Sequence, residues 1–289
     1  MYDESEVRKI VRDALAGLIA DQPSGATHSF TTSRVDDGEA PDVTAISTKD
    51  EFHVPEPNDR DGYMAMKQST VARIGVWRAG PRYNTWSMLH FRADHATAQD
   101  AVFMDVPDEF AEQQGFISGK SRCTSKDEFL TRPDLGRLLD EPTKALFDQK
   151  LPKHAKVTIV VADGLSSAAM VNIPDIVPAI IQGLKTNGIE VGPIPYVKYG
   201  RVGIMDDIGQ IIQSDVICLL IGERPGLATG ESMSAYMAYQ PNPDRPESWR
   251  NVVSNIYSGG TPPTEAGAHV ATVLKKIFDA KVSGVDLSM

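Results

Sequence analysis

The sequence predicts an α/β protein: a parallel β-sheet domain at residues 151–289, preceded by a small helical domain at 63–150 and a flexible N-terminal leader. Three observations predict this order. Helical periodicity dominates the middle of the chain, short apolar strands alternate with helices after about Lys156, and residues 21–62 show neither pattern. With 289 residues, of which 41% are hydrophobic, the chain is long enough to bury a sizeable core.

The leader divides into two parts. Residues 1–20 carry apolar side chains at i, i+3, i+4 and i+7 spacing from Val7 to Ile19, which predicts an amphipathic helix. Residues 21–62 hold few hydrophobics and several Asp, Gly and Pro residues, which predicts a disordered linker. Two roles stay open for the helix: docking on its own domain, or targeting and docking to another protein. Its length and weakly basic face argue against a membrane anchor.

The helical domain is expected to become regular from about Lys67. Ser69 or Thr70 is a candidate N-cap for a helix that breaks at Gly80-Pro81. Further helices are expected at Thr85–Phe103, directly after Pro107, and once or twice within residues 131–149. Few strand patterns occur in this part of the chain.

The sheet domain follows a strand–helix alternation. Strands are expected within residues 156–162, 189–200, 215–222 and 250–256, and helices within 172–186, 204–214, 230–239 and 262–284. Runs such as VICLLI at 216–221 are apolar without alternation, which is typical of parallel strands covered on both faces. The predicted domain is therefore Rossmann-like.

The carboxyl ends of such strands form the usual binding edge of the sheet. Loops rich in Gly, polar and charged residues are expected there, at 163–166, 199–202, 222–226 and 254–255. A dinucleotide fingerprint is missing, because the first turn, ADGLSS, holds one glycine and the second strand leads to Arg201 rather than an acid. A nucleotide-dependent oxidoreductase is therefore disfavoured, and a different ligand is expected at this edge.

Candidates for chemistry are sparse. Neither Cys123 nor Cys218 has a nearby histidine partner, the six histidines show no zinc spacing, and no G-x-S-x-G occurs. We therefore predict no catalytic residue and no metal ligand in this chain. A net charge of −10 argues against nucleic-acid binding, and no apolar run reaches the 18 residues of a membrane span. The two distant cysteines and the lack of a secretory leader favour the cytoplasm.

Several motifs together resemble those of one family. STVARIGVWRAGPR (69–82), LTRPDLGRLLDE (130–141), IGERPGLATGESMSAYMAY (221–239) and RNVVSNI (250–256) resemble the small (light) subunit of ethanolamine ammonia-lyase, across residues 67–289. The resemblance implies an adenosylcobalamin-dependent lyase that converts ethanolamine to acetaldehyde and ammonia. It implies a large subunit that binds the substrate, an assembly of six large and six small subunits, and no activity without the large subunit. It also implies that some members work in a bacterial microcompartment, with the leader helix directing them to its shell.

The resemblance also implies three cobalamin contacts: Val202, Glu223 and Val252. Relatives often have Cys where this chain has Val252, so a backbone or apolar contact is expected there instead. Arg224 is left open between a ligand contact and pairing with an acid of the partner subunit. Gly226 is expected to need a positive φ. A non-catalytic scaffold or cargo adaptor of a microcompartment is the alternative function.

Overall fold

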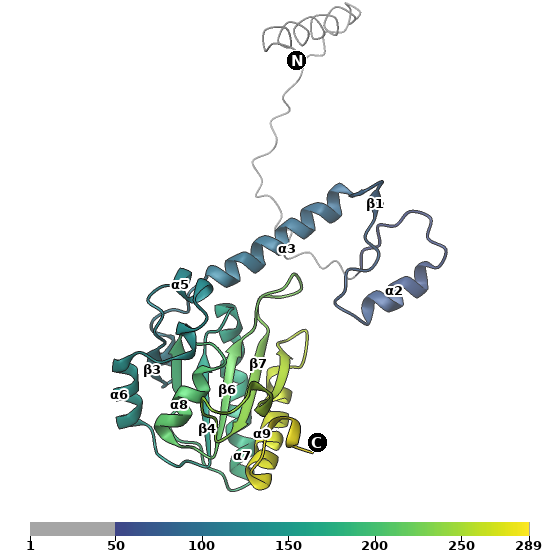
Figure 1. The fold of residues 1–289 in the computed structure, drawn as a ribbon. Coiled ribbons are helices and arrows are strands. Elements are labelled where there is room, and N and C mark those ends of the chain that lie inside the picture. Colours follow the sequence, from purple (N-terminus) through teal and green to yellow (C-terminus); the bar gives the residue numbers. More distant parts are fainter. Residues whose placement is uncertain (1–49, 289) are drawn as a thin grey trace, which may run out of the picture. The chain divides into compact units, whose positions relative to one another are not determined.

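The computed structural model describes residues 50–288, so the predicted leader helix at 1–20 and most of the predicted linker lie outside the described residues. Six strands form the main sheet in the order β3-β5-β4-β6-β7-β8 (Figure 1). Their bounds are Ile117–Lys120 (β3), Val157–Ala162 (β4), Pro195–Lys198 (β5), Val216–Gly222 (β6), Met233–Tyr239 (β7) and Asn251–Ile256 (β8).

The predicted α/β class is confirmed, but the sheet is mixed rather than fully parallel. β3, β5, β4 and β6 run parallel to one another, whereas β7 is antiparallel to both β6 and β8. After β4 the chain crosses to β5, which lies on one side of β4. After β5 it crosses back to β6, which lies on the other side of β4. The strand order therefore reverses beside β4, which creates the crevice where ligands of open α/β sheets bind. The Rossmann-like description stays a prediction.

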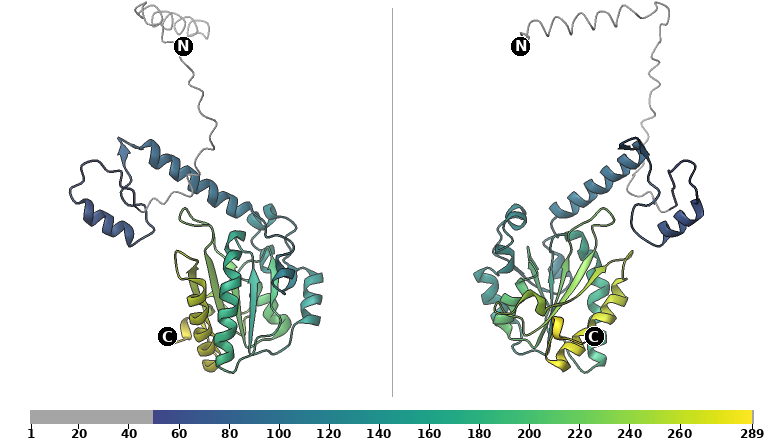
Figure 2. Two further views of the ribbon diagram at one scale, coloured as in Figure 1. Left: turned by 180° about the vertical axis from the view of Figure 1, so that it is seen from behind. Right: turned by 45° about the vertical axis from the view of Figure 1, so that its right-hand side comes forward.

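Helices cover both faces of the sheet, as Figures 1 and 2 show from opposite sides. On one face lie α7 (Ile173–Thr186) and α9 (Pro263–Ala280). On the other lie α6 (Glu141–Lys150) and α8 (Ile204–Ile212). Short 3-10 turns complete the chain at Leu135–Arg137, Ser167–Asn172, Glu247–Trp249 and Gly284–Asp286.

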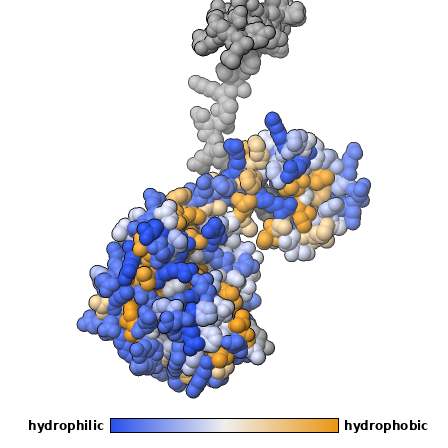
Figure 3. Space-filling model, in the orientation of Figure 1, coloured by the Kyte–Doolittle hydropathy of each residue, from blue (hydrophilic) through white to orange (hydrophobic). Residues whose placement is uncertain are grey.

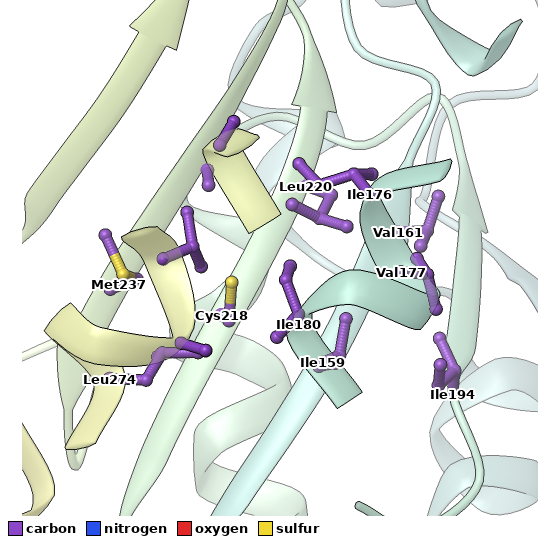
Figure 4. Packing of buried hydrophobic residues seen from close by; sticks show 14 of the residues in the cluster. Ile159, Val161, Ile176, Val177, Ile180, Ile194, Cys218, Leu220, Met237 and Leu274 are labelled. Atoms are coloured by element: carbon purple, nitrogen blue, oxygen red, sulfur yellow. The ribbon is translucent and has the colours of Figure 1, made fainter. Parts of the chain in front are cut away.

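The sequence of β6 does not alternate between apolar and polar residues because both faces of this strand are buried. Val216, Cys218 and Leu220 pack toward α7 and α9, as Figure 4 shows for the latter two, while the residues between them pack on the opposite face. All seven residues of β6 are buried. Residues Ser167–Thr186 are long and apolar enough by composition to span a membrane. Within that stretch, however, Ile180 and other residues of α7 are buried against the sheet.

The prediction of a helix at 230–239 is wrong, because Met233–Tyr239 forms β7. Met and Ala favour helices in isolation, but this preference is weak and tertiary context overrides it. Met233, Ala235 and Met237 alternate into the core beneath α9, and the strand fills the space between β6 and β8. The short strand predicted at 250–256 is confirmed as β8.

Between residues 50 and 84 the secondary structure differs from the prediction. The first described helix, α2, spans Arg60–Gln68, because Asp59 caps it by accepting from the Gly62 amide at 2.8 Å. Ser69, predicted as an N-cap, instead ends α2, with its amide donating to Met66 O. No helix follows within residues 69–84; a hairpin of β1 (Arg78–Ala79) and β2 (Arg82–Tyr83) turns at Gly80.

The long helix predicted at Thr85–Phe103 is confirmed as α3, with Asn84 accepting from the Ser87 amide at 2.7 Å. Two shorter helices follow, α4 (Phe110–Gln113) and α5 (Lys126–Thr131). Between them lies β3, a strand that the helical reading of this part missed. It pairs with β5 as an edge strand of the main sheet. Whether the chain divides into domains at residue 150 stays a prediction.

Candidate functional site

Three of the four predicted loops meet where β4, β5 and β6 end, whereas the fourth, predicted at 254–255, lies within strand β8. Because these strands are parallel neighbours, residues 163–166, 199–202 and 223–226 leave the sheet at the same edge. A pocket of about 190 Å³ lies among them, at the point where the strand order reverses. Its lining comes from all three loops and from strands β6 and β7: Gly164, Leu165, Gly200, Arg201, Val202, Ile221, Gly222, Glu223, Arg224, Ser234 and Tyr236.

Two glycines allow the first and third loops to touch. Gly164 has φ +62, and a Cβ there would overlap the carbonyl oxygen of Gly222. At Gly222, a Cβ would lie 2.5 Å from the Asp163 carbonyl oxygen and closer still to that of Ser166. The Leu165 amide donates to Gly222 O at 3.1 Å across this contact. Backbone groups thus line the pocket closely, which side chains at these two positions would prevent.

Glu223 is held by its own chain. Its carboxylate accepts from Ser232 Oγ at 2.7 Å, from Ser234 Oγ at 2.5 Å and from the Asn255 amide at 3.0 Å. The three donors come from the start of β7 and the end of β8, so Glu223 fixes these strands to the end of β6. A carboxylate has about four acceptor positions, so about one remains for a ligand donor.

Val202 lies in the same pocket as Glu223, half-buried in the loop after β5. This loop is held by the 130–141 motif and by Phe129, which directly precedes that motif. The Arg201 amide donates to Gly136 O at 2.8 Å, and its guanidinium donates to Phe129 O at 2.6 Å. A Cβ on Gly136 would lie 2.6 Å from Arg201 Cγ. Two motifs separated by about 60 residues in the sequence therefore form one structural unit.

Val252 does not line this pocket, but it lies on the same face of the sheet. It pairs with Tyr236 across β7 and β8, and paired side chains point to the same face. Tyr236 lines the pocket, and the Val252 side chain is 48% exposed beside it. The structure thus places an apolar position next to the site, in keeping with the apolar contact expected there.

The expectation for Gly226 is wrong. Its φ lies outside the left-handed region, and a Cβ there would meet nothing within 4 Å. The glycines that the site requires are Gly164 and Gly222 instead. Arg224 is exposed, and the described residues offer it no ion pair, so both of its predicted roles stay open.

Sequence reasoning assigned no role to Asp163, although an acid directly after an apolar strand was a usable signal. It is completely buried, and burial raises its pKa to about 6. Its Oδ1 accepts from the Gly200 amide at 3.3 Å, whereas its Oδ2 has no partner among the described residues. Asp163 therefore links the first and second loops from within.

Residue Arg250, next to the expected contact at Val252, also has a structural role. Its guanidinium donates to Asp206 Oδ2 at 2.5 Å, and both side chains are largely buried. This ion pair joins β8 to the start of α8. Within residues 50–288, no group of three or more His, Cys, Asp or Glu side chains is arranged to hold a metal ion.

The comparisons with known proteins agree on one family. The family model described as "Ethanolamine ammonia-lyase light chain (EutC)" matches residues 60–288. A protein of Listeria innocua named ethanolamine ammonia-lyase small subunit is 49% identical over 291 residues, covering 99% of both chains. Proteins of the same name from Clostridium perfringens and Clostridium tetani are 53% identical over 248 residues (86% of this chain, 84% of the relative) and 46% identical over 298 residues (100% of both). The chain therefore belongs to the ethanolamine ammonia-lyase small-subunit family.

Proposed function

We propose that the edge formed by the loops after β4, β5 and β6 holds part of adenosylcobalamin in an ethanolamine ammonia-lyase, while the large subunit binds ethanolamine. The observation that carries the proposal is the position of Glu223. A carboxylate fixed by three hydrogen bonds faces a pocket at the crevice of the sheet, beside the apolar Val202. A ring edged with amide groups needs both kinds of contact.

The residues present fit such a group at its edge. The pocket volume of about 190 Å³ is smaller than a whole corrin ring, so this chain would enclose one side of the cofactor and leave the rest to another subunit. Glu223 has an acceptor position for an amide N–H, and the close contact of Gly164 with Gly222 brings backbone groups to the surface. Val202 and the exposed Val252 would contact the apolar parts of the ring.

Adenosylcobalamin, when bound, would supply the radical chemistry of the reaction. The residues of this chain position the group: Glu223 orients an amide, and Val202 packs against the ring. No side chain of this chain is assigned a bond-making role, so we expect the small subunit alone to be inactive. The family resemblance favours six small and six large subunits in the cytoplasm, or in a microcompartment that residues 1–20 would target.

The test is co-expression of the full chain with a large subunit and measurement of ethanolamine turnover with adenosylcobalamin. Glu223→Gln should leave subunit assembly intact and weaken cofactor binding by about tenfold, because one charge-assisted hydrogen bond is lost. Ser232→Ala is the matched control: it removes an internal donor but keeps the carboxylate, and cofactor affinity should change by less than about threefold. Unchanged cofactor affinity in Glu223→Gln would refute the contact.

A further inference from the structure

Residues 62–93 bury polar side chains and expose apolar ones, which is the reverse of the usual distribution in a folded protein. Of the fourteen exposed large hydrophobics among residues 50–288, eight lie here: Tyr63, Met66, Val71, Trp77, Tyr83, Met88, Leu89 and Phe91. In the described chain, the first buried hydrophobic residue is Ala101, whereas the buried residues of this stretch are the polar Lys67, Ser87 and His90. Figure 3 shows hydrophobic residues gathered on the surface where Figure 1 places α2 and β1. Exposed apolar patches of this kind mark interaction sites.

The charge of this stretch is as unusual as its hydrophobicity. The chain has a net charge of −10, yet residues 62–93 contain five Lys and Arg residues and no Asp or Glu. Arg82 and Arg92 are exposed, and neither forms an ion pair with any residue of the described chain. Aromatic residues, Met and Arg are the residue types enriched in protein–protein interfaces. The basic apolar surface, as we call residues 62–93, therefore fits a protein partner that is apolar with acidic side chains.

A pocket of about 360 Å³ opens beside this surface and holds buried polar atoms without a partner. Its lining includes residues of the surface together with Glu51, His53, Asp94, Leu227 and Ala228. Ser87 is 8% exposed and His90 is 4% exposed, yet Ser87 Oγ and His90 Nε2 have no hydrogen-bond partner among the described residues. Lys67 is also buried, and its ammonium donates to one acceptor among residues 50–288, Glu51 O, at 2.5 Å. An ammonium has three N–H groups, so Lys67 can still donate to further acceptors in this pocket.

The acids that line the pocket are already engaged. Glu51 Oε2 accepts from Trp86 Nε1 at 2.8 Å and lies 3.0 Å from His53 Nε2, and Asp94 is paired with Arg73. The remaining donors would be satisfied by one further carboxylate from outside the chain. Burial lowers the pKa of Lys67, although the nearby carboxylates of Glu51 and Asp50 act in the opposite direction.

We infer that the basic apolar surface docks on the large subunit, and that a carboxylate of the large subunit enters the pocket to accept from Lys67, Ser87 and His90. The partner follows from the family, because a small subunit has a large one. The stretch also belongs to what the family shares, since the family match begins at Arg60, the first residue of α2. The inference rests on the proposed function only in its choice of partner. The basic apolar surface is distant in sequence from Val202 and Glu223, although Leu227 and Ala228 also line its pocket.

The first experiment measures assembly of the full chain with the large subunit. Leu89→Asp and Arg92→Glu should each weaken subunit affinity by about tenfold or more, as expected for residues within an interface. Val285→Asp and Lys276→Glu are matched controls, because both side chains are exposed outside the surface, and affinity should change by less than about twofold. Circular dichroism checks that each variant is folded. Unchanged affinity in both surface variants would overturn the inference.

The second experiment uses the buried hydroxyl, for which the inference predicts opposite effects in two states. In the chain alone, Ser87→Ala removes an unpaired polar atom, so stability to urea should stay the same or rise. In the complex, the same change removes a donor to the incoming carboxylate, so assembly should weaken by about threefold to tenfold. A loss of stability in the free chain without any change in assembly would count against the pocket as a carboxylate site.

Hydrogen exchange of the wild-type chain distinguishes the remaining outcomes. Protection of residues 62–93 that appears only when the large subunit is added supports the inference. Protection already present in the chain alone, with a dimer in light scattering that Leu89→Asp dissociates, would assign the surface to a second copy and overturn it. If wild-type subunits assemble and turn over ethanolamine while this surface stays unprotected, the inference fails and the proposed function stands. If they do not assemble at all, the proposed function fails first.

Discussion

The contact between Gly222 and the loop at 163–166 allows a sharp test by Gly222→Ala. A Cβ at this position would lie 2.5 Å from the Asp163 carbonyl oxygen, and real Cβ contacts essentially never fall below 3.0 Å. The loop would have to retreat by at least the difference, 3.0 − 2.5 = 0.5 Å, and further for Ser166. It is held in place by Leu165, whose amide donates to Gly222 O at 3.1 Å. The obstacle is backbone, so no side-chain rotation relieves it.

Overpacking of a buried site costs roughly 1–3 kcal/mol, and we expect Gly222→Ala near the upper value because backbone must move. About 3 kcal/mol corresponds to a fall in Tm of roughly 6–12 °C for a chain of this size class. Urea unfolding and thermal scans of the full chain measure the effect. Gly226→Ala is the control, since its Cβ would meet nothing within 4 Å, and stability should change by less than about 0.5 kcal/mol. Equal Tm values for the two variants would refute the packing argument.

Three further predictions concern buried groups. Because the pKa of Asp163 is raised to about 6 from 3.8, folding favours its protonated form, and its contribution to stability is lost as pH rises from about 4 to about 6. The stability of Asp163→Asn relative to wild type should therefore rise by about 3 kcal/mol between pH 4 and pH 7 in urea titrations, and a constant difference would contradict this. Arg250→Met should lower the free energy of unfolding by about 3–5 kcal/mol, because it leaves Asp206 buried without its partner. Arg132→Met breaks an exposed ion pair and should lower it by less than about 1 kcal/mol in the same assay. Cys218 is fully buried, and burial raises its pKa to about 12, so it should react with a thiol reagent only as fast as the chain unfolds; rapid labelling of the folded chain would disprove its burial.

The sequence was most informative where burial is two-sided. β4 and β6 were predictable because strands covered on both faces are apolar throughout, and each is bounded by a polar loop. The positions of those loops then placed Val202 and Glu223 at one edge. Motif resemblance alone selected these two residues, and the pocket brings them together.

Other features depended on contacts that the sequence does not display. Residues of β7 form a strand because they pair with β6 and β8 on either side, although their intrinsic preference is helical. The requirement for Gly222, rather than Gly226, comes from a loop about 60 residues earlier. The fixed geometry of Glu223 depends on Ser232, Ser234 and Asn255, which no periodicity connects to it.

Strand β3 has a consequence for the order of folding. Residue 117 pairs with residue 195, so a ribosome releases β3 well before β5, its strand partner in the described part of the chain, has been made. During that interval a neighbouring helix can shield the nascent strand. The Lys120 amide donates to Thr143 Oγ at 3.0 Å, and Gly119 lies directly under the side chains of Thr143 and Phe147. We expect α6 and β3 to pack against each other during synthesis, before the rest of the sheet forms. β3 would then join the edge of the sheet last, when β5 becomes available.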